Sequence, residues 1–429
     1  MGNYQGYQKY KDSGVEWLGE IPEHWDIWKV THGFKNVGSG TTPKSDNSTF
    51  YDGDIPWITT SELRETLIED TSQKVTQEAL KNHSALKVYP KGSIAIAMYG
   101  ATIGRLGILG IDATVNQACY VFSESEIFHL PFFYYWLWMH RPNLIALSAG
   151  GGQPNLSQDD LKQLRLPTPT LNEQEKIAQF LDYKTKQIDE LIKKKETLIE
   201  KLDEKRTAII SHAVTKGLDS SVPIKDSGVE WLGDIPKHWE VKKLQYIGRL
   251  KSGENIISQQ IDKEGLYPVF GGNGLRGYFD SYTHDGHYIL IGRQGALCGN
   301  INYANGKFWA SEHAVVITPS INFDVYWLGE LLKAMNLNQY STSAAQPGLS
   351  VEQISRVKTP FPPIYEQKQI SKHLDQKTTQ IDQQKAKIKQ AIELLKEYRT
   401  SLITNAVTGK IDVSQIAIPS PQKPQPQKG

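Results

Sequence analysis

The chain has 429 residues, 39% of them hydrophobic and 22% charged, and its 48 basic and 47 acidic side chains leave a formal charge of +1. This length exceeds one ordinary core and predicts several domains. A nearly neutral charge argues against a protein that coats nucleic acid by bulk charge, although it leaves room for a local basic face. The two cysteines, Cys119 and Cys298, lie in unrelated contexts, so we expect no disulfide, no zinc site and a cytoplasmic location.

Two segments of the sequence occur twice. Residues 12–25 read DSGVEWLGEIPEHW, and residues 226–239 read DSGVEWLGDIPKHW. The Glu173-Gln174 pair and the residues after it return in the same way from Glu366-Gln367 onward. The chain is therefore two half-molecules in tandem, which predicts a pseudo-two-fold architecture.

The spacing between the copies changes along the chain. It is 214 residues from Asp12 to Asp226, 212 from Pro56 to Pro268, 195 from Gly100 to Gly295 and 193 from Gln174 to Gln367. The ends of each half match closely, whereas the middle is shorter and more divergent in the second copy. Constant ends around a variable middle predict one shared scaffold that carries two different binding surfaces.

In chain order, the sequence predicts mixed α/β domains alternating with long helices. Short β-like runs separated by glycine turns, such as residues 93–99, indicate a globular domain with a twisted sheet. The apolar run of residues 127–139 is too short to span a membrane and predicts a buried helix. We expect globular domains at 1–169 and 218–363, long helices at 170–217 and 364–412, and a disordered tail at 413–429.

The two helical segments carry apolar residues at spacings of three and four. This periodicity predicts a coiled-coil seam, and we expect the two helices to pack against each other. A lone helix docked on its own domain is the alternative. Asn172 is the expected N-cap of the first helix, and Gly217 follows its end. The predicted helix–helix packing residues are Ile177, Leu181, Ile188, Leu191, Leu198, Leu202, Ile209, Ile370, Leu374, Ile381, Ile388, Leu395 and Leu402.

The sequence contains no motif typical of a catalytic site. It has no P-loop, no zinc spacing and no nucleophile elbow. Residues 272–277 match a dinucleotide-binding fingerprint, but the next five residues do not start a helix, so we interpret this stretch as a glycine-rich hairpin or a recognition loop.

Several loops instead combine glycine with amide, basic and aromatic side chains, which suits contacts to nucleic acid. Glycine allows the backbone to approach closely, while Arg can read guanine and Asn or Gln can read adenine. Each such residue taken alone is more often an ordinary solvated side chain, and the Gly100/Gly104 and Gly295/Gly299 pairs are typical of structural turns. The candidate DNA-binding residues are Thr41, Thr42, Lys44, Tyr99, Thr102, Arg105, Asn116, Gln117, Lys251, Asn273, Arg276, Arg293, Gln294 and His313.

These motifs and their order resemble the specificity subunits of type I restriction-modification systems. The matching pieces are residues 14–25 and their repeat, 40–43 with 55–58, 152–157, 166–177, and 346–350 with Glu366-Gln367. The resemblance covers about residues 7–412, and the second globular domain departs from it most. It implies two target-recognition domains, each reading half of a bipartite, asymmetric DNA site. It also implies that the two long helices pack as an antiparallel coiled coil and set the spacer.

The resemblance also implies partners and cofactors that this chain does not encode. Two methyltransferase subunits would bring S-adenosylmethionine, and two translocating endonuclease subunits would bring ATP and Mg²⁺. We therefore expect a non-catalytic subunit with no metal of its own. Two alternatives stay open: a coiled-coil adaptor that binds only proteins, and a self-sufficient DNA methyltransferase or nuclease, although no adenine-flipping motif is present.

Overall fold

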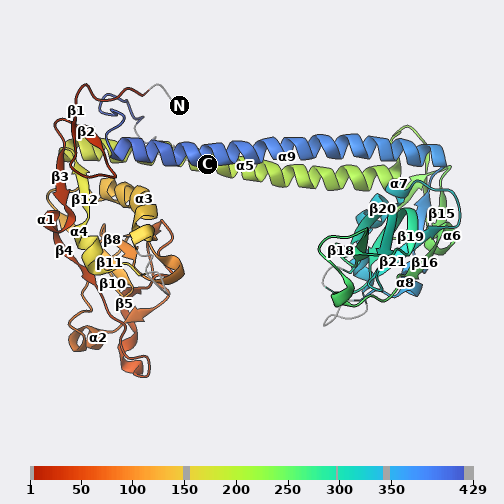
Figure 1. Cartoon of the computed structure of the whole chain (residues 1–429), viewed down its shortest axis with the longest axis horizontal. Coiled ribbons are helices and arrows are strands. Elements are labelled where there is room, and N and C mark those ends of the chain that lie inside the picture. Colours follow the sequence, from red (N-terminus) through yellow and green to blue (C-terminus); the bar gives the residue numbers. More distant parts are fainter. Residues whose placement is uncertain (1–3, 148–154, 296–297, 342–347, 420–429) are drawn as a thin grey trace, which may run out of the picture. The chain divides into compact units, whose positions relative to one another are not determined.

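The computed structural model describes residues 4–147, 155–295, 298–341 and 348–419. The chain forms two compact units. Unit 1 comprises residues 1–194 and 391–429, and unit 2 comprises residues 195–390. Each unit thus contains one mixed α/β domain together with a segment of each of two long helices, α5 and α9 (Figure 1).

Unit 1 begins with the first copy of the repeated signature (residues 12–25, repeated as 226–239), and its globular part ends where α5 starts. Two short 3-10 turns aside, its described elements up to and including α5 follow in chain order. They are β1 (Tyr10–Asp12), β2 (Glu20–Pro22), β3 (Asp26–Lys29), α1 (Val30–Gly33), β4 (Phe34–Ser39), β5 (Tyr51–Ile58), β6 (Leu67–Ile68), β7 (Lys74–Val75), α2 (Gln77–Asn82), β8 (Ile94–Ala97), β9 (Leu106–Leu109), β10 (Thr114–Val115), β11 (Cys119–Ser125), α3 (Leu130–Leu147), α4 (Gln158–Gln163), β12 (Arg165–Thr168) and α5 (Leu171–Lys216).

Unit 2 repeats the order of these elements with fewer pieces in the middle. They are β13 (Ile224–Asp226), β14 (Asp234–Pro236), β15 (Glu240–Lys243), α6 (Leu244–Ile247), β16 (Gly248–Ser252), β17 (Tyr267–Gly271), β18 (Gly274–Phe279), β19 (His284–Gly292), β20 (Ile301–Ala310), β21 (Ala314–Pro319), α7 (Val325–Ala334), α8 (Val351–Arg356), β22 (Lys358–Phe361) and α9 (Ile364–Val407). The fingerprint-like stretch forms the β17–β18 hairpin, as the sequence predicts.

The main sheets of the two units share one antiparallel core. Its strand order is β4-β11-β8-β9 in unit 1 and β16-β21-β19-β20 in unit 2. In unit 2 the long strand β20 continues and pairs in parallel with β17, with Val269 opposite Trp309. In unit 1 the same stretch is broken into β9 and β10, and β10 pairs in parallel with β5, with Trp57 opposite Thr114. The Pro56/Pro268 match in the sequence therefore marks equivalent strands.

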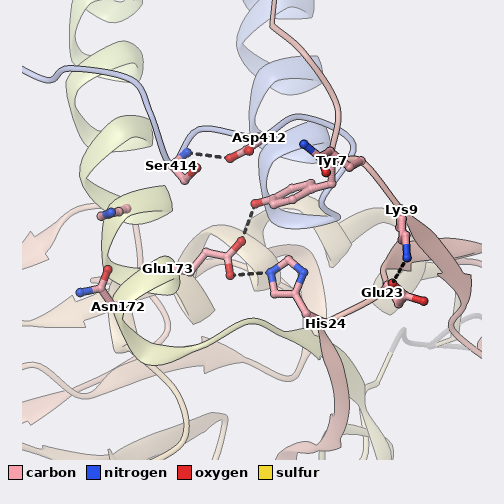
Figure 2. Close-up of a pocket in the computed structure, with 10 residues that line it drawn as sticks. Tyr7, Lys9, Glu23, His24, Asn172, Glu173, Asp412 and Ser414 are labelled. Atoms are coloured by element: carbon pink, nitrogen blue, oxygen red, sulfur yellow. Dashed lines mark hydrogen bonds and ion pairs between the residues drawn. The ribbon is translucent and has the colours of Figure 1, made fainter.

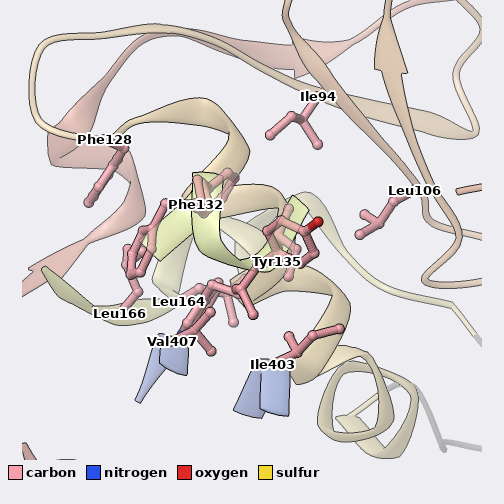
Figure 3. Close-up of a cluster of buried hydrophobic side chains, with 14 of the residues drawn as sticks. Ile94, Leu106, Phe128, Phe132, Tyr135, Leu164, Leu166, Ile403 and Val407 are labelled. Carbon is pink, nitrogen blue, oxygen red and sulfur yellow. The ribbon is translucent and has the colours of Figure 1, made fainter. Parts of the chain in front are cut away.

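The core of unit 1 lies between the sheet and three helices, α3, α5 and α9. It includes Ile94 and Leu106 of the sheet and the aromatic side chains of α3. Because α3 carries apolar side chains on most of its sides, it is buried on most of them. Figure 3 shows Ile403 and Val407 of α9 in the same cluster as Tyr135 of α3. Because Ile403 and Val407 lie near the C-terminal end of α9, the last helix of the described chain completes a core that the first domain begins.

Both long helices form within the predicted ranges: α5 fills nearly all of 170–217, whereas α9 ends at Val407, five residues before the predicted end at 412. The N-cap of α5 is Thr170 rather than Asn172, because Thr170 Oγ1 accepts a bond from the Glu173 amide at 3.4 Å. Gly217, with φ of 81°, follows the last turn in the left-handed conformation that a C-terminal glycine allows.

The seam between α5 and α9 follows heptad spacing, but it differs from the predicted one at two positions. Leu191 and Leu198 are 43% and 48% exposed, so they do not lie in the buried seam. Buried or half-buried residues instead continue through the neighbouring positions Ile192 and Ile199. The other predicted packing residues are buried (Ile177, Leu181, Ile188, Leu202, Ile370, Leu374, Ile381, Leu402) or half-buried (Ile209, Ile388, Leu395).

Equivalent ion pairs join the two helices inside each unit. In unit 1, Arg399 Nε lies 3.0 Å from Asp189 Oδ1, and in unit 2, Arg206 Nη1 lies 2.6 Å from Asp382 Oδ1. Arg206 to Arg399 and Asp189 to Asp382 are both steps of 193 residues, the spacing of the repeat. The antiparallel pairing therefore contains one ion pair in each unit, formed by equivalent positions of the two copies.

The segment after α9 packs onto unit 1 for part of its length. Val413 is 3% exposed, and Ile416 and Ile418 lie against the same core, so residues 413–419 do not fit the predicted disordered tail. Residues 420–429 lie outside the described part of the chain.

Candidate nucleic-acid interface

In unit 1, the candidate loops meet at one end of the main sheet. Ser39 ends β4 opposite Tyr120, and Ala97 ends β8 opposite Cys119, so the loops that follow β4 and β8 and precede β11 emerge together. Gly40 lies under the neighbouring loop, because a Cβ there would come within 1.7 Å of the Val115 carbonyl oxygen.

Backbone hydrogen bonds connect these loops into one surface. The amide of Asn116 donates to Ile58 O at 2.9 Å, Met98 donates to Ala118 O at 2.8 Å, and Leu156 donates to Met98 O at 2.9 Å. The turn between β8 and β9 is closed by Gly104 donating to Ala97 O at 2.8 Å. The loop positions are therefore fixed before any ligand binds.

Unit 2 repeats this skeleton bond for bond. The corresponding donors and acceptors are Ser311 to Phe270, Arg293 to His313, Leu349 to Arg293 and Gly299 to Gly292, at 2.7–2.9 Å. Gly253 takes the place of Gly40, since a Cβ there would lie 2.1 Å from Ala310 O. The Gly100/Gly104 and Gly295/Gly299 pairs all have positive φ, between 66° and 89°, as tight turns require.

The side chains on this common skeleton differ between the units. Unit 1 has Met98, Tyr99, Asn116, Gln117 and Ala118 where unit 2 has Arg293, Gln294, Ser311, Glu312 and His313. Unit 1 thus presents mainly amide, hydroxyl and aromatic groups, whereas unit 2 presents a guanidinium, an imidazole and a carboxylate. Two surfaces of one shape and different chemistry suit two different ligands of one class.

The structure places the predicted residues on these loops and their flanking strands. In unit 1, Thr41, Thr42 and Lys44 follow β4, Tyr99, Thr102 and Arg105 lie in the β8–β9 turn, and Asn116 and Gln117 lie between β10 and β11. In unit 2, Lys251 lies in β16, Asn273 and Arg276 in the β17–β18 hairpin, Arg293 and Gln294 after β19, and His313 before β21.

Contacts join some of these residues across loops. Thr42 Oγ1 donates to Gln117 Oε1 at 2.5 Å in unit 1. In unit 2, Arg293 Nη1 donates to Ser252 Oγ at 3.3 Å, and Asn300 Nδ2 donates to Asn273 Oδ1 at 3.1 Å. Lys44, Lys251 and Arg276 are exposed and lie at the surface around these contacts.

Sequence reasoning missed several members of the surface. Gln158 Nε2 donates to Ser39 Oγ at 2.7 Å, and Glu312 Oε1 pairs with His313 at 2.9 Å. The alignment of the two copies was the available signal, because Glu312 occupies the position of Gln117. The loop residues Ala296 and Leu297, and residues 152–154 and 346–347 of the matched motifs, lie outside the described residues.

The repeated signature forms a junction between each domain and the start of its long helix. Glu173 of α5 accepts hydrogen bonds from Tyr7 Oη at 2.6 Å and Trp25 Nε1 at 3.0 Å, and it pairs with His24 Nε2 at 3.1 Å. Figure 2 shows Tyr7 and His24 pointing at this carboxylate in a pocket of about 520 Å³. Burial first, and then the bond to Glu173, raise the pKa of Tyr7, so its hydroxyl stays a donor.

Unit 2 builds the same junction from the second copy. Glu366 of α9 accepts from Trp239 Nε1 at 2.8 Å and pairs with His238 Nε2 at 2.6 Å. Burial acts to raise the pKa of Glu366, but hydrogen bonds from Trp239, His238 and Tyr365 outweigh it and hold the pKa below its ordinary value. The residues that the two copies kept are therefore those that attach domain to helix.

A buried glutamine completes each junction. Gln174 accepts a bond from the His129 amide at 2.8 Å and donates to Ile127 O and Pro169 O. Gln367 accepts from the Asp324 amide at 2.8 Å and donates to Pro362 O. Each glutamine satisfies backbone groups that would otherwise be buried without partners.

Within the described residues, no group of three His, Cys, Asp or Glu side chains could hold a metal ion, and no helix is long and apolar enough to cross a membrane. Cys119 and Cys298 are both buried and free. These findings concern only the part of the chain that the structure describes.

The architecture defines a class of protein: two domains of one fold with divergent surface loops, each joined to a long helix. A model of the type I restriction modification DNA specificity domain matches residues 22–201 and again residues 236–394. The chain therefore belongs to the family of type I restriction-modification specificity proteins.

Individual relatives agree with this membership. The chain is 33% identical over 357 residues to the EcoprrI specificity subunit of Escherichia coli, covering 79% of this chain and 84% of that protein. It is 23% identical to the MjaVIII specificity subunit of Methanocaldococcus jannaschii, covering 95% of this chain and 98% of that protein.

Among solved structures, a chain from a study of assembly and conformational transition of the type I R-M system has a TM-score of 0.71 at 16% identity, over 90% of this chain and 98% of that chain. The HsdS subunit of Thermoanaerobacter tengcongensis has a TM-score of 0.58 at 16% identity, over 91% and 98%. These two structures support the fold.

Proposed function

We propose that this chain is the DNA-reading subunit of a type I restriction-modification complex, in which each unit reads one half of a bipartite, asymmetric site. The observation that carries the proposal is the repeated loop skeleton with different side chains at the end of each main sheet. Each loop surface would enter the major groove, where base edges can be told apart by their donors and acceptors.

The partners proposed for this chain follow from its family. Two methyltransferase subunits would supply S-adenosylmethionine, and two endonuclease and translocase subunits would supply ATP and Mg²⁺. The chain itself would contribute recognition and a scaffold in the cytoplasm and no catalytic group. Because its formal charge is only +1, we expect weak DNA binding by the chain alone and tight binding once the methyltransferases add their surfaces.

The test is to express the chain together with type I methyltransferase subunits from the same genome and to map methylated DNA genome-wide. We expect one bipartite motif that disappears when the gene for this chain is deleted. Methylation that persists without the chain would favour a coiled-coil adaptor that binds only proteins. Methyl transfer by the pure chain would favour a self-sufficient methyltransferase.

The long helices are proposed to set the unread spacer between the half-sites. Insertion of seven residues into both α5 and α9 keeps the heptad phase and adds about 10 Å of helix. At about 3.4 Å per base pair, the methylated motif should gain about three spacer positions with both half-sites unchanged. Altered half-sites with an unaltered spacer would contradict this role.

A further inference from the structure

We propose that Gln117, held by Thr42, is the residue of unit 1 that selects an adenine in its half-site. This inference rests on the proposed function, because it assigns one base to one position of the DNA that unit 1 reads. It starts from the 2.5 Å hydrogen bond in which Thr42 Oγ1 donates to Gln117 Oε1 between two loops that are 75 residues apart in sequence.

The loop that carries Thr42 is anchored on both sides of this residue. Trp57 Nε1 donates to Thr41 O at 3.3 Å, and the Tyr51 hydroxyl donates to Pro43 O at 2.6 Å. Both anchors come from β5, which is paired within the domain. The Thr42 hydroxyl is thus held at a defined place while its side chain stays exposed.

The loop that carries Gln117 is anchored in the same way. The amide of Asn116 donates to Ile58 O at 2.9 Å, and the amide of Ala118 donates to Asn116 Oδ1 at 3.1 Å. Asn116 therefore uses its side-chain oxygen to shape the loop. Gln117 is exposed between these anchors, and its side chain is oriented by a residue from another loop.

In the conformation that the structure shows, the Thr42 bond uses one lone pair of Gln117 Oε1. After that bond, Oε1 keeps a second lone pair and Nε2 keeps two N–H donors. An acceptor beside a donor matches adenine, which presents its N6 donor and N7 acceptor in the major groove. Guanine presents two acceptors there, O6 and N7, so the same amide would leave one of them unpaired.

Preorganisation distinguishes Gln117 from an ordinary surface glutamine. A free glutamine loses side-chain freedom when it binds a base, and it can present either end of its amide. The bond to the Thr42 hydroxyl restrains the side chain before a base binds and so removes part of that loss. In unit 2 the equivalent residue is Glu312, whose Oε1 pairs with His313 at 2.9 Å, so this reading position differs between the units in charge and in anchoring.

The experiment uses the full chain in complex with its methyltransferase subunits and a plasmid library in which every position of the methylated motif is randomised. The measurement is the methylated fraction for each base at each position. We expect Gln117→Ala to reduce the preference for adenine about 10-fold at one position of one half-site. Gln117→Glu should shift that position toward cytosine, whose N4 group donates to a carboxylate.

Variants of Thr42 test the anchoring. Thr42→Val removes the hydroxyl at nearly constant shape and should reduce discrimination at the same position about threefold, whereas Thr42→Ser keeps the hydroxyl and should match the wild type. Gln163→Ala, at an exposed glutamine of the same unit, is the matched control and should change nothing. The other half-site should be unaffected in all five variants.

The inference is overturned if Gln117→Ala leaves the preference at every position within twofold of the wild type, or if Gln163→Ala alters it equally. A Thr42→Val variant with full discrimination would refute the role of the hydroxyl. Failure of the proposed function looks different, because the wild-type complex would then methylate the library without any sequence preference.

Discussion

Unit 1 and unit 2 differ most in the segment between two equivalent strands. This segment runs from β5 to β8 in unit 1 and from β17 to β19 in unit 2. Residues 59–93 of unit 1 form β6, β7 and α2 there, whereas residues 272–283 of unit 2 form little more than the β18 hairpin strand. The loop skeleton on either side of this region is nevertheless the same in both units. Large changes are therefore accommodated where they do not touch the junction or the backbone of the loops.

The junctions show the opposite behaviour. Trp25 and Trp239 are completely buried, and each donates to the glutamate that begins a long helix. Replacing the glutamate would leave the buried indole N–H unsatisfied, and replacing the tryptophan would leave a cavity and remove one donor from the carboxylate. Either change costs stability without altering a binding surface. The comparison separates residues that hold the domain from residues that can vary with the ligand.

The largest expected effect concerns the buried glutamines. Gln174→Ala removes three hydrogen bonds and Gln367→Ala removes two, and both leave a cavity, so we expect losses of about 4 and 3 kcal/mol in unfolding free energy. Denaturant unfolding of the full chain measures both. Gln179→Ala, exposed on the same helix as Gln174, should lie within about 0.5 kcal/mol of the wild type. Equal results for all three would show that the junctions do not stabilise the units.

A second expected effect distinguishes the units by pH. His140 of α3 is buried and stacks on Trp136, and burial lowers its pKa to about 4, whereas the equivalent residue of unit 2 is Met335. The folded state keeps His140 neutral, so stability is complete above the unfolded pKa of about 6.5 and falls as the pH drops toward 4. At pH 5 the loss should be about 2 kcal/mol.

His140→Met gives unit 1 the residue of unit 2 and should remove this loss. The measurement is unfolding free energy at pH 8 and pH 5 for both proteins. A variant that loses as much stability as the wild type between these two pH values would show that His140 does not titrate as inferred.

The smallest expected effect concerns the repeated ion pairs. Asp189–Arg399 and Arg206–Asp382 are partly exposed, so a double-mutant cycle should give a coupling of about 0.5 kcal/mol for each.

Arg399→Ala should lower the unfolding free energy more than Arg206→Ala does, because the Arg399 guanidinium also lies 5.1 Å from the Trp138 ring centroid. Equal costs would indicate that this ring contact contributes nothing.

Much of the fold could be predicted from the sequence because a comparison of the two copies shows which segments are equivalent and which have diverged. The shift in spacing from 212 to 195 residues located the shortened middle, and Pro56/Pro268 identified equivalent strands. The seam was misassigned at Leu191 and Leu198 because the isoleucines that follow them, Ile192 and Ile199, fit a spacing of three and four equally well. The buried stripe shifts by one residue at Thr185 and then runs through Ile192 and Ile199, which are half-buried.

The candidate surface was predictable in its location but not in its contacts. Glycine turns and flanking amides identified the loops, and the two copies indicated which loops correspond. The sequence could not show that Thr42 contacts Gln117 or that Trp25 contacts Glu173, because these partners are 75 and 148 residues apart and meet only once the chain has folded.

The central claim is that the two units read different halves of one DNA site. It is tested most directly by mapping the methylated motif for Gln117→Ala in unit 1 and Arg293→Ala in unit 2, each in the full complex. We predict that each variant relaxes one half-site, that the two affected half-sites are different, and that the spacer is unchanged. Relaxation of the same half-site by both variants, or of neither, would contradict the account.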